Sequence, residues 1–401
     1  MATDGVGASG GSDAGGGSQS AESGSVNGET PSTDGGAAAD TSANAGASDA
    51  GASSVSVNDG IAGSHSGAGA GAVLGAYAGA RSLGTAGIRG FAGAVATLRD
   101  AADTGHVWIG AALSASHIDD TSYLSVAGSE FNYLTPENEM KWTSTEANQN
   151  QFNFAGGDTL VSFAQSHQMR VKGHTLVWHS QLPTWVSTLS TADAVRQAMT
   201  THIQTVAGHF KGKLAAWDVV NEAIDDATGN PLRDSIFHQK LGDTYIDEAF
   251  VLAHQADPSA LLFYNDYGIE GMGSKANAAY ALVKRLRESG VPIDGVGLQM
   301  HIRATGSPTA ADIIANMKRI GQLGLLVNIS ELDVNLCAVT GDQAAKFAVQ
   351  EQRYREVVAA CVAEPMCHAV TLWGVADKYS WLNNFAPCTK ADETGSPWAL
   401  P

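Results

Sequence analysis

Eight short apolar segments alternate with segments of helical periodicity from about residue 97 onward, and this alternation limits the possible folds most. The apolar segments span residues 107–113, 131–135, 169–178, 214–222, 261–267, 295–301, 325–333 and 369–375. Their apolar, β-branched composition is typical of buried parallel strands. Eight strands separated by helices favour the α/β class and, at this length, a closed (β/α)8 TIM barrel. A doubly wound open sheet is the alternative, but no G-x-G-x-x-G motif follows the first strand to support it.

Helical patterns fill the intervals between these strands. Thr191 is suited to cap one helix, in which apolar residues recur at helical spacing. Ser307 and Pro308 are suited to open another, and Gly324 stands where its C-cap belongs. Residues 276–286 and 344–362 show the same periodicity. The order of elements is therefore the one that a (β/α)8 barrel requires.

The first 95 residues differ sharply in composition from the rest. They hold about half of the chain's 46 glycines, together with many Ser, Ala, Asp, Asn and Thr residues. Ordering such a segment would cost more entropy than its small apolar surface recovers. We therefore expect residues 1–95 to be a disordered, low-complexity leader and residues 96–401 to form the catalytic barrel. The N-terminus has neither a basic region nor an apolar core, so the sequence as written predicts no signal peptide.

The charge of the chain limits its partners. The formal net charge is −18, which argues against nucleic acid and anionic membranes, because an acidic surface releases no counterions from either. No run of apolar residues is long enough to predict a transmembrane span. A neutral polymer remains compatible with this charge.

Two of the predicted strands end in a glutamate. Residues 216–223 form an apolar run that delivers Asn221 and Glu222 at its end, and residues 325–334 deliver Glu331 in the same way. The C-terminal ends of barrel strands form the catalytic face. Two carboxyl groups facing one cleft are the catalytic pair of glycoside hydrolases. One protonates the leaving oxygen, and the other, ionised, attacks the anomeric carbon. The alternative is a pair of structural carboxylates held in salt bridges.

These strand ends and four further motifs resemble those of family 10 glycoside hydrolases, the endo-β-1,4-xylanases, over about residues 97–400. The motifs are WDVVNEA at 217–223, ISELD at 329–333, TPENEMKW at 135–142, HTLVWH at 174–179, QMH at 299–301 and WGV at 373–375. The resemblance implies a retaining endo-β-1,4-xylanase that hydrolyses internal bonds of xylan and xylo-oligosaccharides without a cofactor. It also implies a secreted enzyme, which we expect to be a monomer.

The resemblance assigns a role to individual residues. It makes Glu222 the acid/base and Glu331 the nucleophile. It implies that Gln299 and His301 orient these glutamates, with support from His179 and Asp333 behind them. The remaining residues that it places in contact with the sugars are Glu137, Asn138, Lys141, His174, Trp178, Asn221, Tyr267, Trp373 and Trp381. Among these, Asn221 would bond the 2-hydroxyl and Tyr267 would stack in the subsite after the cleaved bond.

Several of the aromatic and histidine residues also have a purely structural interpretation. Trp217 and Tyr264 are expected in the core, and Trp185 is as well suited to packing as to a subsite wall. His174 and His179 are five positions apart, so they share no face of a helix and point in opposite directions on a strand. No third ligand is suggested nearby, and we expect no catalytic metal.

The chain departs from the family pattern in two places. Gly268 follows Tyr267 where Asn is common, and the chain stops at Pro401 where the family continues into an eighth helix. We expect the loss of this helix to lower stability and to leave the site complete.

Four cysteines are present, and their even number favours disulfides over buried thiols. The resemblance implies a bridge between Cys361 and Cys367, just before the eighth strand. A pairing of Cys337 with Cys388 is a weaker expectation.

Overall fold

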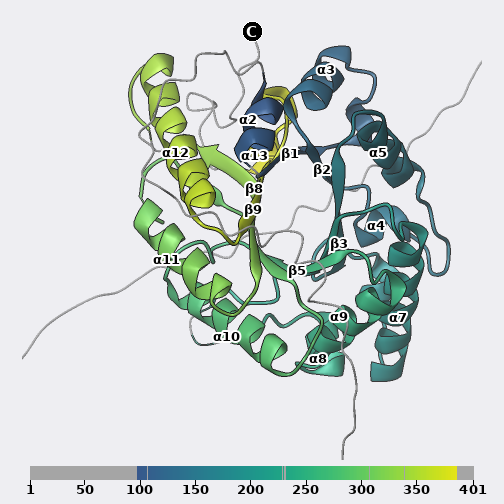
Figure 1. Cartoon of the computed structure of the whole chain (residues 1–401). Coiled ribbons are helices and arrows are strands. Elements are labelled where there is room, and N and C mark those ends of the chain that lie inside the picture. Colours follow the sequence, from purple (N-terminus) through teal and green to yellow (C-terminus); the bar gives the residue numbers. More distant parts are fainter. Residues whose placement is uncertain are drawn as a thin grey trace, which may run out of the picture. The chain divides into compact units, whose positions relative to one another are not determined.

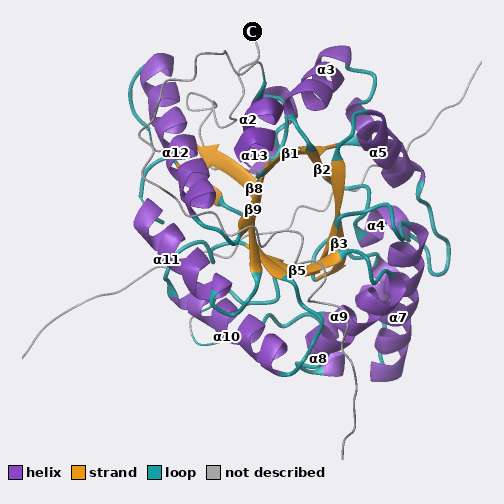
Figure 2. Ribbon diagram, viewed as in Figure 1, coloured by secondary structure: helices purple, strands orange, loops and turns teal. Residues whose placement is uncertain are grey.

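The described part of the chain forms a closed barrel of parallel strands inside a ring of helices (Figures 1 and 2). The computed structural model describes residues 97–385, except 106, 228, 230, 231, 307 and 338. The predicted leader, the boundary at residue 95, Cys388 and the chain end all lie outside these residues. The expectations attached to them, including the missing eighth helix, stay predictions.

The strands close the barrel in a single round. They are β1 (Trp108–Leu113), β2 (Tyr133–Pro136), β3 (Arg170–Trp178), β4 (Ala216–Asn221), β5 (Leu261–Asp266), β6 (Gly295–Leu298), β7 (His301–Arg303), β8 (Leu326–Asn335) and β9 (Cys367–Leu372). Hydrogen bonds join β1 through β6 in chain order; β9 then follows β1, β8 follows β9, and a pairing of β6 with β8 closes the ring. This closure confirms the predicted (β/α)8 barrel.

The predicted sixth strand, residues 295–301, is wrong as one continuous element. β6 ends at Leu298, and β7 begins at His301 as a separate pairing with β8. The backbone of Met300 has φ of +64°, which an extended strand does not allow. The chain therefore turns here, and Gln299 and His301 come from a bend at the mouth of the barrel.

The helices are the outer layer of the barrel. They are α2 (Leu98–Gly105), α3 (Thr121–Glu130), α4 (Trp142–Thr145), α5 (Ala155–Ser166), α6 (Thr184–Ser187), α7 (Ala192–His209), α8 (Ile236–Leu241), α9 (Tyr245–Ala256), α10 (Ser274–Glu288), α11 (Ala310–Gly321), α12 (Gln343–Ala363) and α13 (Leu382–Phe385), with short 3₁₀ turns at Ala115–His117 and Asp377–Tyr379. Within residues 97–385, apart from the gaps given above, no helix is long and apolar enough to span a bilayer.

Two of the predicted helix starts can be compared with the structure. Thr191 caps α7, because its hydroxyl accepts a hydrogen bond from the backbone of Ala194, as predicted. The start predicted at Ser307 and Pro308 is two residues early. Thr309 is the cap of α11, and it forms a reciprocal capping box with Asp312. A side chain three residues into the helix therefore decides where α11 begins.

In the core, a glycine of β3 lies beside a large indole of β4. Trp217 and Tyr264 are fully buried, as expected. A Cβ atom at Gly173 would lie 2.2 Å from the Trp217 ring, so only glycine fits beside this indole.

The predicted bridge between Cys361 and Cys367 is present and joins the end of α12 to the start of β9.

Candidate active site

A cavity of about 660 Å³ opens at the C-terminal ends of the strands. It is lined by Glu137, Asn138, Lys141, His174, Trp178, His179, Ser180, Gln181, Asn221, Glu222, Tyr267, Gln299, His301, Glu331, Trp373 and Trp381. All of the predicted catalytic and sugar-contacting residues are in this set, although they come from segments far apart in the sequence. Ser180 and Gln181 were not predicted, and their signal was only that they directly follow the HTLVWH motif.

Glu222 is held on both carboxylate oxygens. The indole Nε1 of Trp178 donates to Oε2 at 2.8 Å, and the amide Nε2 of Gln299 donates to Oε1 at 2.9 Å. The imidazole Nδ1 of His179 lies 4.0 Å from Oε2, and this ring lines the cavity itself rather than standing behind it. Burial lowers the pKa of His179, which favours the neutral ring. The carboxyl thus has a fixed orientation toward the cavity.

Glu331 is buried among donors and positive charge. The amide Nδ2 of Asn265 donates to Oε1 at 2.7 Å, and Nε2 of His301 lies 3.1 Å from Oε2. Burial by itself raises the pKa of Glu331, but the charge of His174, the hydrogen bond and charge of His301, and the charge of Lys172 together lower it to about 2. Glu331 is therefore ionised at neutral pH, which is the state that a nucleophile needs.

His301 is itself fixed by Asp333, as predicted. Its Nδ1 lies 2.9 Å from Oδ2 of Asp333, so both ring nitrogens contact carboxylates. Burial lowers the pKa of His301, but the charge and hydrogen bond of Asp333 and those of Glu331 outweigh it and raise the pKa well above the ordinary value. The indole of Trp381 also donates to Oδ2 of Asp333, at 2.7 Å. The two carboxylates therefore favour the charged form of the His301 ring, which lies next to Glu331.

The two glutamates are connected through a chain of side-chain amides. Gln299 donates to Glu222 and, at 3.2 Å, to Oδ1 of Asn221. Asn265 donates to the same oxygen at 2.9 Å and also to Glu331. The positions of both carboxyls are therefore coupled through Asn221. Asn265 was missed in the sequence, although it stands at the end of the fifth strand, beside Asp266.

A buried ion pair lies behind His174. Lys172 Nζ is 2.8 Å from Oδ2 of Asp218, and Nδ1 of His174 is 2.9 Å from the same oxygen. Because a carboxylate only accepts, His174 donates from Nδ1, and its Nε2 faces Glu331 at 3.9 Å. Neither Lys172 nor Asp218 was identified in the sequence. The signal was the polar alternation of residues 170, 172 and 174 in an otherwise apolar strand.

In the wall that carries Glu137, Asn138 and Lys141, the lysine is buried and the other two residues are partly exposed. Lys141 Nζ donates to Oδ1 of Asn138 at 3.1 Å and lies 5.0 Å from the centre of the Trp178 ring. Burial raises the pKa of Glu137 and lowers that of Lys141. These groups offer charged donors and acceptors to the hydroxyl rim of a ligand.

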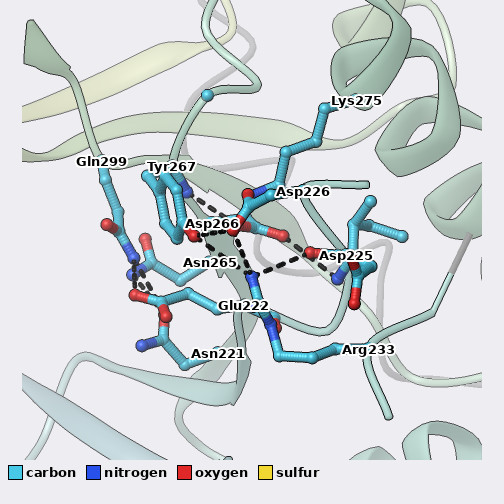
Figure 3. Close-up of polar contacts among 12 residues, drawn as sticks. Asn221, Glu222, Asp225, Asp226, Arg233, Asn265, Asp266, Tyr267, Lys275 and Gln299 are labelled. Carbon is cyan, nitrogen blue, oxygen red and sulfur yellow. Dashed lines mark hydrogen bonds and ion pairs between the residues drawn. The ribbon is translucent and has the colours of Figure 1, made fainter. Parts of the chain in front are cut away.

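A cluster of charged groups lies on the other side of Glu222 (Figure 3). Tyr267, which lines the cavity, donates its hydroxyl to Asp226 and accepts from Arg233 at 3.2 Å. Lys275 lies 3.5 Å from the centre of the Tyr267 ring and bonds to Asp226 at 2.8 Å and to Asp266 at 3.1 Å. Burial, partly offset by Lys275, raises the pKa of Asp266 to about 7. Of these residues, only Tyr267 was assigned a role from the sequence.

Trp185 is a packing residue rather than part of the cavity wall. Its Nε1 donates to the carbonyl of Glu146 at 3.3 Å, and its ring meets Trp142 edge to face. Within the described residues, no group of three or more His, Cys, Asp or Glu side chains is arranged to hold a metal ion.

Sugars present hydroxyl rims and apolar C–H faces, and the cavity offers carboxylates, amides and indole rings that suit both. The barrel, with two glutamates fixed at its mouth, defines the class of the protein as a glycoside hydrolase. A family model described as glycosyl hydrolase family 10 matches residues 97–398, and the chain belongs to this family.

Relatives of known name support this assignment. The chain is 40% identical to endo-1,4-beta-xylanase B of Thermotoga neapolitana over 268 residues, which cover 67% of this chain and 76% of that protein. The structure of xylanase 10B from Thermotoga petrophila RKU-1, in complex with xylobiose, matches with a TM-score of 0.70 at 38% identity, over 73% of this chain and 89% of that one. A family 10 xylanase from Bispora sp. MEY-1, also with xylobiose, matches with a TM-score of 0.69 at 34% identity, over 73% of this chain and 91% of that one.

Proposed function

We propose that this glycoside hydrolase is a retaining endo-β-1,4-xylanase that acts on xylan and xylo-oligosaccharides by double displacement. The observation that carries the proposal is the contrast between the two glutamates. Glu331 is buried, and the donors Asn265 and His301 keep it ionised. Glu222 is held by the neutral donors Trp178 and Gln299. This contrast suits a nucleophile and an acid/base respectively. The two relatives with bound xylobiose support the choice of substrate.

In the first step, Glu222 donates its proton to the leaving glycosidic oxygen while Glu331 attacks the anomeric carbon. The bond to the leaving sugar breaks, and an ester between the sugar and Glu331 forms. In the second step, Glu222 takes a proton from water, the water attacks the same carbon, and the ester breaks to release the sugar and the Glu331 carboxylate. The configuration at the anomeric carbon is therefore retained.

The cavity is lined by both glutamates, and in the proposed reaction it holds sugars before and after the cleaved bond. We propose that Glu137, Asn138, Lys141, His174, Trp178, Trp373 and Trp381 hold the sugar before the cleaved bond, and that Tyr267 stacks on the sugar after it. Asn221, which already orients the amides between the glutamates, would bond the 2-hydroxyl. We also propose that the enzyme is a monomer that works outside the cytosol, where a disulfide such as Cys361–Cys367 persists.

The test compares Glu331→Ala with Glu222→Ala. Glu331→Ala is expected to bind xylan and to lose nearly all turnover on every substrate. Glu222→Ala is expected to retain the first step on aryl xylobiosides whose leaving group needs no proton, and added azide should then release a β-xylobiosyl azide. Proton NMR of the wild-type reaction should show the β-anomer first. An α-anomer, or appreciable hydrolysis by Glu331→Ala, would refute the mechanism, and faster release of reducing sugar from glucan or mannan than from xylan would refute the substrate.

A further inference from the structure

Arg233 lies behind Glu222 and bonds to its main chain. It belongs to the segment between β4 and α8, which the structure describes except for residues 228, 230 and 231. Its Nε donates to the carbonyl of Glu222 at 3.2 Å, and its Nη2 donates to the carbonyl of Ile224 at 3.2 Å. Its own backbone N–H donates to the carbonyl of Ala223 at 2.7 Å. One arginine therefore holds three successive carbonyls that begin at Glu222.

The main chain of Glu222 needs such support. Its φ is +56°, in the left-handed region that residues with a side chain rarely adopt. Such conformations persist where the surroundings determine them. The backbone N–H of Glu222 donates to the carbonyl of Asn265 at 2.8 Å, and Arg233 holds the carbonyl on the other side of the same residue. The φ and ψ of Glu222 determine where its Cβ points, and so where the carboxyl lies.

The guanidinium of Arg233 is fixed in turn. Its Nη2 lies 3.2 Å from Oδ2 of Asp226 and 3.2 Å from the hydroxyl of Tyr267. Asp226 is held from its other oxygen by Lys275, at 2.8 Å. Figure 3 shows Arg233 reaching from below Glu222 toward this group of side chains. The side chain of Arg233 is 19% exposed, and it is not among the residues that line the cavity.

We propose that Arg233 is the positioning residue of the acid/base Glu222, and that Asp226 fixes Arg233 for this task. Arg233 holds Glu222 in its left-handed conformation and so aims the carboxyl at the leaving oxygen, without touching the sugar. This inference rests on the proposed role of Glu222. A lysine would be a poor substitute, because one ammonium does not reproduce the planar fork that reaches four acceptors.

The test is the dependence of kcat/KM on the leaving group, because general-acid help matters most when the leaving oxygen needs a proton. Arg233→Met is compared with the wild type on a series of aryl xylobiosides from dinitrophenyl to phenyl. We expect kcat/KM to fall by less than about 3-fold with dinitrophenyl and by roughly 100-fold with phenyl. The larger figure is the loss that a misplacement of about 1 Å produces. Asp226→Asn, which keeps the shape of the side chain, should give a smaller loss with the same trend.

A matched control separates positioning from folding. Arg319 makes two side-chain hydrogen bonds, to Asn316 and Asn277, and lies over the Tyr280 ring. Arg319→Met also replaces a hydrogen-bonded, ring-packed arginine, here within α11 and between α11 and α10, and should leave the leaving-group dependence unchanged. Thermal unfolding of each variant shows how much stability is lost in each case.

Two results would overturn the inference. One is an equal loss on all leaving groups in Arg233→Met, which would mean general structural damage. The other is a kcat/KM equal to that of the wild type on every leaving group in both Arg233→Met and Asp226→Asn. Glu222→Ala is measured on the same series, and if it lacks the steep dependence, the proposed role of Glu222 fails instead, independently of Arg233.

Discussion

The ammonium of Lys172 lies 2.8 Å from Oδ2 of Asp218, and neither side chain is more than 1% exposed. The same oxygen accepts from Nδ1 of His174, whose other nitrogen faces the proposed nucleophile. Two opposite charges are thus buried inside the barrel, directly behind the catalytic face. Removing one partner of such a pair leaves a buried charge without compensation.

We predict that Lys172→Met lowers the free energy of unfolding by about 3–5 kcal/mol, the range measured when one partner of a buried pair is removed. Urea unfolding followed by tryptophan fluorescence gives this value. The double variant Lys172→Met with Asp218→Asn should recover part of the loss, because no unpaired charge remains. A single variant as stable as the wild type would show that Asp218 is compensated by His174 alone.

The low pKa of Glu331 depends partly on His301, and this dependence predicts a shift in the pH profile. The hydrogen bond and the charge of His301 both lower the pKa of Glu331, whose value is about 2. Since the nucleophile must be ionised, activity is lost as the pH falls through this pKa. His301→Gln removes the charge, so the pKa of Glu331 rises and the acid limb of kcat/KM moves to higher pH.

Initial rates with an aryl xylobioside between pH 3 and pH 7 would measure this shift of the acid limb. His238→Gln is the control, because His238 pairs with Asp243 on the surface and its ring is 29% exposed. An acid limb in His301→Gln that coincides with that of the wild type would mean that other groups, such as His174, suffice to keep Glu331 ionised.

The bridge between Cys361 and Cys367 closes a loop with a sequence separation of 6. Closing so short a loop is expected to contribute about 2 kcal/mol in the chain-entropy estimate. We therefore predict that the double variant Cys361→Ala with Cys367→Ala has a melting temperature a few degrees lower than that of the wild type. Turnover should stay at the wild-type level, because Cys367 begins β9 while the cavity lies at the strand ends. Calorimetry with and without a reductant tests this, and identical melting temperatures in all cases would contradict it.

Much of the site could be predicted because it depends on where strands end. Glu222 and Glu331 each follow an apolar run, and parallel strands in a barrel bring their C-terminal ends to one face. The sequence could not show which side chains meet between neighbouring strands. His174 and Asp218 contact each other because the register of β3 and β4 places them side by side. That register depends on the packing of the whole barrel.

Two further features depend on backbone conformations that a hydrophobic pattern does not reveal. The break between β6 and β7 follows from the positive φ of Met300, and the pose of Glu222 follows from its own positive φ. Neither residue is glycine, so neither position carries the usual sequence signal for such a conformation. Arg233 was missed for a related reason: the groups that link it to Glu222 are backbone carbonyls, which every residue has.

Trp381 contacts the site in two ways, and two substitutions can separate them. Its Nε1 donates to Asp333 at 2.7 Å, and its ring lies 4.8 Å from that of His301 at the edge of the cavity. Trp381→Phe keeps an aromatic face and loses the donor, whereas Trp381→Ala loses both. If the apolar face of a sugar packs on the ring, KM for xylotetraose should rise far more in the alanine variant. A contact of about 1.5–3 kcal/mol corresponds to a change in KM of roughly 10- to 100-fold.

Steady-state kinetics of both Trp381 variants gives the answer, with Trp185→Phe as the control for an indole outside the cavity. Equal losses in the two variants would mean that the ring packs on no sugar, and that Trp381 acts through Asp333 on the charge of His301.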